Sequence, residues 1–233
     1  MDQLMTNNPS IVQQIREEIE SRGYKKLADV PIATRGDVWY CHERSTEDAT
    51  HVLELTYKPK LKAYGVHVGV FNLKARALIE QWMPSLQKFL DPIVLERPYI
   101  IGRPCWNCFD AGRGLKWSGT YNLPDPNDRD GWLARVDHLF ADFIEPIFFP
   151  IRDAQGVQNL LFKTEAPFEW FAADGVLRVS EIVALAWVAG NVDAHLREQL
   201  LPFKRDVERY LIQSEIKDYE ALLDFLLSRS LSD

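Results

Sequence analysis

Three stretches typical of β-strands follow one another in the first third of the chain, and they restrict the fold more than any other feature. Residues 37–43 (DVWYCHE) and 51–58 (HVLELTYK) are rich in aromatic and β-branched side chains. In residues 63–71 (AYGVHVGVF) the valines occupy every second position, so that they share one face of the strand. The short loop around Pro59 and Lys60 predicts that the second and third stretches form an antiparallel hairpin.

Two helices are expected to flank these strands. Isoleucine recurs every four residues from Ile11 to Ile19, Asn8 can cap this first helix and Gly23 can end it. Asn72 is suited to cap a second helix directly after the third strand. The buried stripe of that second helix is predicted to contain Leu78, Trp82, Leu86 and Phe89.

Beyond the second helix the pattern is less regular until about residue 130. Residues 93–101 and 113–121 are predicted to be two further strands, joined by a connection rich in Gly, Cys and aromatic residues.

The second half of the chain carries helical periodicity throughout. A first stripe is predicted to stop at Pro146, and residues 177–189 are apolar on nearly every side, as in a central buried helix. Residues 191–213 are amphipathic, and Pro202 is expected to divide them into two helices. The first stripe consists of Trp132, Val136, Leu139 and Phe143, and the stripe of the last helix consists of Tyr219, Leu222, Leu223 and Leu226.

A run of strands followed by a run of helices is typical of the α+β class. We therefore predict a mainly antiparallel sheet with flanking helices in residues 1–125 and a helical part in residues 126–233, together forming one compact unit.

The charge of the chain is distributed unevenly. The net charge is −7, and residues 1–125 hold 16 Lys/Arg and 15 Asp/Glu, whereas residues 126–233 hold 11 and 19. This balance argues against general nucleic-acid binding. The acidic half either presents solvated helix faces or provides a surface for a basic partner.

Other features of the composition favour a cytoplasmic protein. The longest strongly apolar run, residues 182–189, is too short to cross a bilayer, and the N-terminal residues do not resemble a secretory signal. Three cysteines do not form a disulfide framework.

Cys105 and Cys108 form a CxxC pair, which can hold a metal or form a redox disulfide. A tetrahedral zinc site needs a second pair of ligands, and the remaining cysteine, Cys41, is followed by the lone His42. The flanking Gly and Pro residues are typical of a loop and not of a thioredoxin-like helix start. We therefore expect no metal and no cofactor, and interpret both residues as ordinary thiols.

The segment DPNDRDG, residues 125–131, has a partial likeness to a calcium-binding loop. Pro126 then occupies the first ligand position and Asp137 the twelfth, where the motif requires an oxygen ligand and a glutamate. Capping of the following helix by Asp128 or Asp130 is the better interpretation.

A histidine and a glutamate are brought together by the predicted hairpin. If the hairpin closes at Pro59 and Lys60, His67 lies opposite Val52 and near Glu54. The two residues would form either a functional His–carboxylate pair or an ordinary polar contact between strands.

The order of elements resembles that of a group of bacterial proteins. A helix, the turn at Gly23 and Tyr24, strands containing VWYC and HVLELTY, and the sequence YGVHVGVFN before a helix are similar to uncharacterised bacterial cytoplasmic proteins. Such proteins are often found among the immunity proteins of polymorphic toxins. The resemblance covers about residues 10–90, and the PFEWF segment and residues 182–189 more loosely. It implies a non-catalytic protein that neutralises a cognate toxin, and it identifies no functional residue.

We accordingly expect a protein partner, such as a basic toxin domain, bound by the acidic half. The alternatives are an enzyme that uses dispersed carboxylates or the Cys105/Cys108 pair, and a structural subunit that associates with itself. The predicted partner-binding residues are Trp170, Glu198, Asp206, Glu208 and Glu215.

Overall fold

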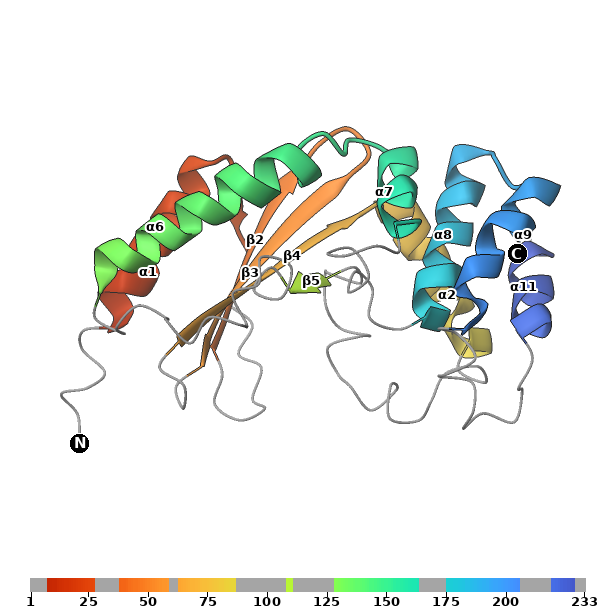
Figure 1. Ribbon diagram of the computed structural model, residues 1–233, viewed down its shortest axis with the longest axis horizontal. Helices are drawn as coiled ribbons and strands as arrows, with labels where there is room; N and C mark the ends of the chain where they lie inside the picture. Colours follow the sequence, from red (N-terminus) through yellow and green to blue (C-terminus); the bar gives the residue numbers. More distant parts are fainter. Residues whose placement is uncertain are drawn as a thin grey trace.

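The computed structural model describes residues 8–27, 38–58, 63–86, 108–110, 128–163, 175–205 and 219–228. The molecule is elongated, with a sheet and two long helical segments at one end and a group of helices at the other (Figure 1). In the described ranges, strands occur up to residue 110 and helices alone follow it, which confirms the predicted α+β class and its division into a sheet half and a helical half.

The sheet is antiparallel, and its strands lie side by side in the order of the chain, β1-β2-β3-β4-β5. All three predicted strands are present, as β2, β3 and β4. A very short strand, β1, extends one edge. The bounds are Lys25–Lys26 for β1, Val38–Ser45 for β2, Thr50–Lys58 for β3, Ala63–Phe71 for β4 and Cys108–Asp110 for β5.

The far edge of the sheet differs from the prediction. Cys108–Asp110 pairs with β4 as strand β5, although the sequence favoured a loop there. The two strands predicted at residues 93–101 and 113–121 lie outside the described residues.

The register of the β3–β4 hairpin also differs from the prediction. Lys58 pairs with Ala63, so that four residues connect the strands, and the whole pairing is displaced by two positions. His67 consequently faces Glu54, and Val52 faces Gly69. Because side chains alternate with a period of two, this displacement leaves every residue on its predicted face.

One face of the sheet is covered by helices. α1 (Asn8–Ser21) and α6 (Arg129–Leu139) lie next to each other on it, and a π-helical segment, η3 (Phe140–Phe148), continues α6 (Figure 1). The isoleucine stripe of α1 is buried as predicted. On the sheet, the side chains at this face include Leu53, Leu55, Val66, Val68 and Val70.

The prediction that Pro146 ends the first helix of the second half is wrong. The helix continues to Phe148, and Pro146 lies exposed within η3. Hydrogen bonds in this segment span five residues, as from the Phe149 N–H to the Ile144 carbonyl at 3.1 Å. This wider turn allows the chain to pass a residue that has no N–H to donate.

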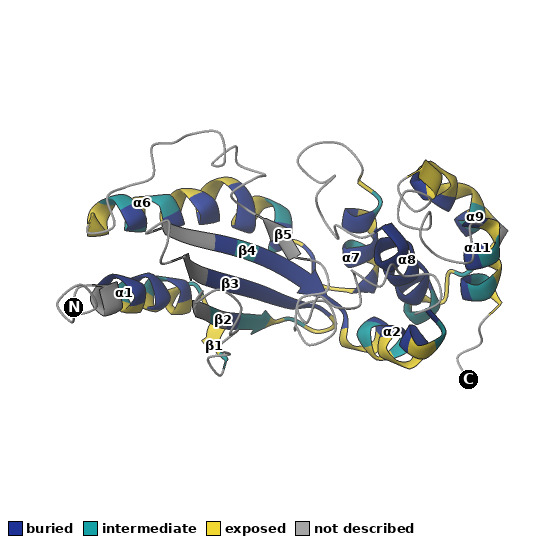
Figure 2. Ribbon diagram, turned by 90° about the horizontal axis from the view of Figure 1, so that it is seen from below, coloured by how far each residue is buried: buried dark blue, intermediate teal, exposed yellow. Residues whose placement is uncertain are grey.

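The other end of the molecule is built around α8 (Gly175–Ala189), which is buried from Gly175 to Ala186 (Figure 2). The prediction of a central buried helix is therefore confirmed. α2 (Leu73–Leu86) and α7 (Ala154–Leu161) pack against α8. α9 (Ala194–Leu200), the 3₁₀ turn η5 (Leu201–Phe203) with Pro202, and α11 (Tyr219–Leu227) complete this end.

Side-chain caps define where several helices begin. Asn72 accepts hydrogen bonds from the N–H groups of Lys74 and Ala75, both at 3.0 Å, so the predicted cap of α2 is confirmed. Asp128 caps α6 through the Gly131 N–H at 2.9 Å, as the capping interpretation of the DPNDRDG segment requires. Within the described ranges, no helix combines the length and the apolar character needed to cross a membrane.

Candidate functional site

Carboxylates gather on the two helical segments that cover the sheet. α1 and the continuous α6–η3 helix together carry seven Asp/Glu and three Lys/Arg, a formal net charge of −4. We call this surface the acidic helix layer. Its carboxylates are Glu17, Glu18, Glu20, Asp130, Asp137, Asp142 and Glu145.

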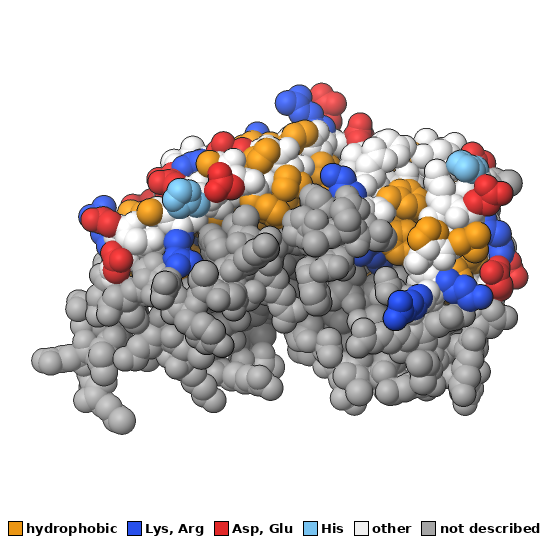
Figure 3. Space-filling view, viewed as in Figure 1, with side chains coloured by type: hydrophobic (Ala, Val, Ile, Leu, Met, Phe, Trp, Pro, Cys, Tyr) orange, Lys and Arg blue, Asp and Glu red, His pale blue; other side chains and the backbone are white. Residues whose placement is uncertain are grey.

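The acidic helix layer faces solvent. Asp142 is 67% exposed and Asp137 58% exposed, because α6 and η3 turn their apolar side chains towards the sheet. The space-filling view shows carboxylate side chains along this part of the surface, next to a histidine (Figure 3). Exposed carboxylates of this kind stay hydrated, so their field is available to a partner.

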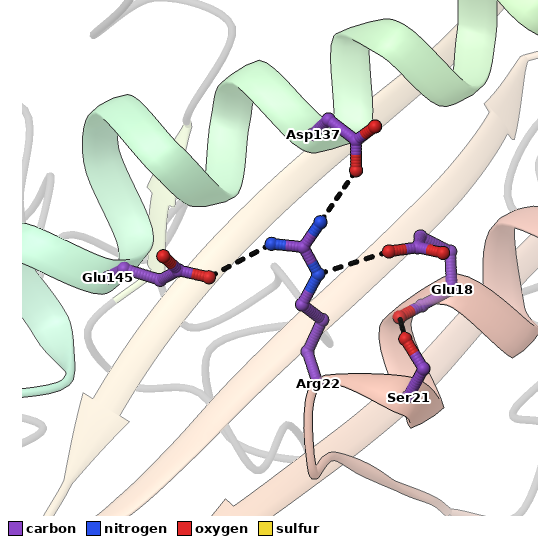
Figure 4. Close-up of polar contacts among 5 residues, drawn as sticks. All are labelled: Glu18, Ser21, Arg22, Asp137 and Glu145. Carbon is purple, nitrogen blue, oxygen red and sulfur yellow. Dashed lines mark hydrogen bonds and ion pairs between the residues drawn. The ribbon is translucent and has the colours of Figure 1, made fainter.

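Arg22 joins the two helices of the layer. Its guanidinium donates to Glu18 at 3.0 Å, to Asp137 at 2.6 Å and to Glu145 at 2.9 Å (Figure 4). The guanidinium also lies over the Phe140 ring, with 4.9 Å between the guanidinium carbon and the ring centroid. Three carboxylates from two distant parts of the chain therefore converge on one planar cation, the geometry that suits arginine.

Burial by itself would lower the pKa of Arg22, but the hydrogen bonds to Glu18 and Glu145 and the nearby negative charges raise it above its ordinary value. Arg22 thus stays charged. The layer remains acidic around it, because the other carboxylates outnumber the remaining cations.

Of the predicted partner-binding residues, the structure describes Glu198, which lies outside the acidic helix layer. Glu198 is on α9, is 73% exposed and lies 3.1 Å from the His195 ring nitrogen Nδ1. On the same end of the molecule, Arg197 pairs with Glu220 at 2.5 Å and also with Asp224. The remaining predicted residues, Trp170, Asp206, Glu208 and Glu215, lie outside the described residues.

The fold brings together carboxylates from both halves of the chain, although the charge count of the sequence assigned the acidic character to the second half alone. Glu17, Glu18 and Glu20 belong to the nearly neutral first half, yet α1 packs beside α6 of the second half, and η3, which continues α6, adds Asp142 and Glu145. The i, i+4 spacing of Glu18 and Arg22 was a visible signal for a local ion pair. The contacts of Arg22 with Asp137 and Glu145 had no such signal, because they span more than a hundred residues.

The opposite face of the sheet carries a second set of chemical groups. Glu54, at 1% exposed, faces His67 across β3 and β4, and the pairing continues to Cys41 on β2 and Asp110 on β5. Among the side chains that are described, no three His, Cys, Asp or Glu residues converge on one metal position. Cys41 and Asp110 are placed by their backbone pairing, and Cys105 lies outside the described residues.

Comparison of this chain with protein-family models, with curated proteins and with solved structures found no match.

Proposed function

We propose that this chain is a non-catalytic, protein-binding protein of the immunity type, which neutralises a basic toxin domain. The acidic helix layer is the surface that would meet the partner. The proposal joins the resemblance in the first 90 residues to the charge arrangement of the folded chain.

The observation that carries the proposal is the side-by-side placement of α1 and α6–η3, with carboxylates on the solvent side of both. A surface with one dominant sign of charge attracts a partner of the opposite sign and accelerates the encounter. The surface around α9 and α11 is less one-sided: in the described ranges, the carboxylates Asp193, Glu198, Glu220 and Asp224 are accompanied by Arg197, Lys204 and Arg205. The layer is therefore the stronger candidate, and Glu198 marks a second one.

The experiment begins with capture of the partner from the protein's own host, including the product of the adjacent gene as a candidate. The chain and a double variant, Glu17→Lys with Asp142→Lys, are then compared in association kinetics with that partner at low and high salt. Both residues are exposed, and neither bonds to Arg22. We expect association of the double variant to be slower by about tenfold at low salt, with a smaller difference at high salt.

Two further variants serve as matched controls. Glu47→Lys changes an exposed carboxylate in the β2–β3 turn, which is not part of the layer, and should leave the association rate nearly unchanged. Glu198→Lys tests the second surface on α9 in the same way. Equal association rates for the double variant and the Glu47 variant would rule out the layer, and a slow Glu198 variant would move the interface to α9.

A further inference from the structure

The short connection between η3 and α7 is attached to one end of the β2–β3 hairpin. The His51 ring nitrogen Nε2 lies 2.8 Å from the Ile151 carbonyl oxygen. The Arg152 carbonyl accepts hydrogen bonds from the Thr46 hydroxyl at 3.1 Å and from the Asp48 N–H at 3.2 Å. The connection runs beside the β2–β3 turn on its way to α7 (Figure 1). It therefore joins the sheet end of the molecule to the helical end through contacts with a single hairpin.

Phe149, the first residue of this connection, packs among three side chains of the sheet end. The Arg44 guanidinium carbon lies 3.8 Å from the centroid of the Phe149 ring. The rings of His51 and Tyr24 each have their centroids 6.4 Å from that of Phe149. Arg44 is directly opposite His51 in the β2–β3 pairing, where Cβ atoms are about 4.5–5.5 Å apart. The connection thus covers a histidine that has a cation as its neighbour on the sheet.

These surroundings suit the neutral form of His51. The ring is fully buried, and its Nδ1 makes no hydrogen bond within the described part of the chain. A proton on Nδ1 would place a second cation opposite Arg44, and no carboxylate of the described residues pairs with the ring. The Tyr24 hydroxyl stays neutral, because burial raises its pKa more than Arg44 lowers it. The other charged residues of the β2–β3 turn and of the connection are exposed: Glu47, Asp48, Arg152 and Asp153.

A protonated His51 is therefore stable only where water reaches its ring. β3 is paired with β2 on one side and with β4 on the other, so the position of His51 is fixed. The cover is less firmly held, since Phe149 is partly exposed and Pro150 is exposed. The Ile151 side chain is buried, which favours the closed arrangement, so movement of the cover is a transient local opening.

We propose that the connection between η3 and α7 opens locally in acid, when His51 takes up a proton, while the sheet and α8 stay folded. Opening admits water to the ring and breaks the contacts that the connection makes with the β2–β3 hairpin. The inference rests on the contacts of His51 and is independent of whether the acidic helix layer binds a partner.

The test is amide hydrogen exchange of the full chain, followed by nuclear magnetic resonance at pH 7.5 and pH 5.5. Each rate is divided by the intrinsic rate of the amide at that pH. The reporters are the Asp48 N–H, bonded to the Arg152 carbonyl, and the Ile151 N–H, bonded to the Phe148 carbonyl at 3.0 Å. We expect their protection to be lower at pH 5.5 by about tenfold, because a ring in water titrates near pH 6.5. The amides of α8 should change much less.

Two variants separate protonation from loss of contact. His51→Gln can still donate to the Ile151 carbonyl but does not titrate, so its reporters should be equally protected at both pH values. Thr46→Val removes the hydroxyl that donates to Arg152 without changing any titrating group. It should lower protection by the same factor at both pH values and keep the tenfold difference between them.

The parent alone decides the matter if His51→Gln does not fold, because the reporters and α8 are compared within one molecule. Equal protection of the reporters at the two pH values would overturn the proposal. It would also be overturned if the amides of α8 lost protection by the same factor, since the whole chain and not the connection would then be opening.

Discussion

His51 shows how a single residue ties distant segments together. Its ring is fully buried, and Nε2 lies 2.8 Å from the Ile151 carbonyl, which can only accept, so Nε2 carries the proton of the neutral ring. Nδ1 makes no hydrogen bond within the described part of the chain. The ring also packs edge-on against Phe149, over which the Arg44 guanidinium lies. The segment that follows η3 is thereby attached to β3.

The first prediction concerns the pH dependence of stability. Burial lowers the pKa of His51, the hydrogen bond to Ile151 opposes this effect, and the positive charge of Arg44 adds to the lowering. The unfolded chain therefore takes up a proton near pH 6.5 while the folded ring stays neutral. The free energy of unfolding should be unaffected by His51 above that pH and should fall as the pH decreases from 6.5 towards the folded pKa, by at most about 1.4 kcal/mol per pH unit.

His51→Gln provides the comparison, because its amide can still donate to Ile151 but does not titrate. Urea unfolding between pH 7.5 and 5 should give a flatter profile for this variant than for the parent. His195→Gln, which removes an exposed histidine, should retain the slope of the parent. If the free energy of unfolding changes with pH equally in the parent and in the His51 variant, His51 does not control the pH dependence of stability in this range.

At the scale of elements, α7 depends on its first residues. Asp153 accepts a hydrogen bond from the Gly156 N–H at 2.8 Å, and the helix that follows buries Val157, Leu160 and Leu161. From α7, Gln158 donates to the Ile182 carbonyl of α8 at 3.1 Å. The cap therefore fixes the start of a helix that supports the central helix of the bundle.

The second prediction is that Asp153→Ala lowers the free energy of unfolding by about 1 kcal/mol, the usual cost of losing such a cap. Asp153→Asn should stay within about 0.5 kcal/mol of the parent, because asparagine caps helices equally well. Chemical denaturation of the three proteins measures both differences. Equal losses for the alanine and asparagine variants would indicate that the charge of Asp153, and not its capping bond, stabilises α7.

Elements with a regular spacing of apolar residues were predictable from the sequence, whereas features that depend on contacts between distant residues were not. Tyr219, Leu222, Leu223 and Leu226 repeat at helical spacing, and the structure buries all four completely. The register of β3 and β4 depends instead on the length of their connection, which periodicity does not determine. For the same reason the sequence placed His67 two positions from its partner on β3. It also gave no indication that His67 pairs with Asp110, because these residues are more than forty positions apart in the chain.

At the scale of the whole molecule, the two ends share one core. A continuous cluster of buried side chains extends from Ile11 in α1 to Leu226 in α11. α2 follows the sheet directly and packs on α8, and α7 contacts β4. The β2–β3 turn is fixed to the segment before α7 by the hydrogen bond from the Asp48 N–H to the Arg152 carbonyl at 3.2 Å.

The last prediction is that the chain unfolds in one cooperative transition, because one continuous cluster of buried apolar side chains joins the sheet end to the helical end. Leu53→Ala at the sheet end and Leu223→Ala at the helical end each remove a fully buried side chain, and each should cost about 2–5 kcal/mol. Urea unfolding followed by intrinsic fluorescence and by far-ultraviolet circular dichroism should give coincident curves for the parent. Both variants should shift the entire curve to lower urea, since a loss at either end destabilises one common unit. The contrary result would be a two-step curve for the Leu223 variant. Part of its dichroism signal would then be lost at lower urea, while the rest kept the midpoint of the parent, and the helical end would unfold independently of the sheet.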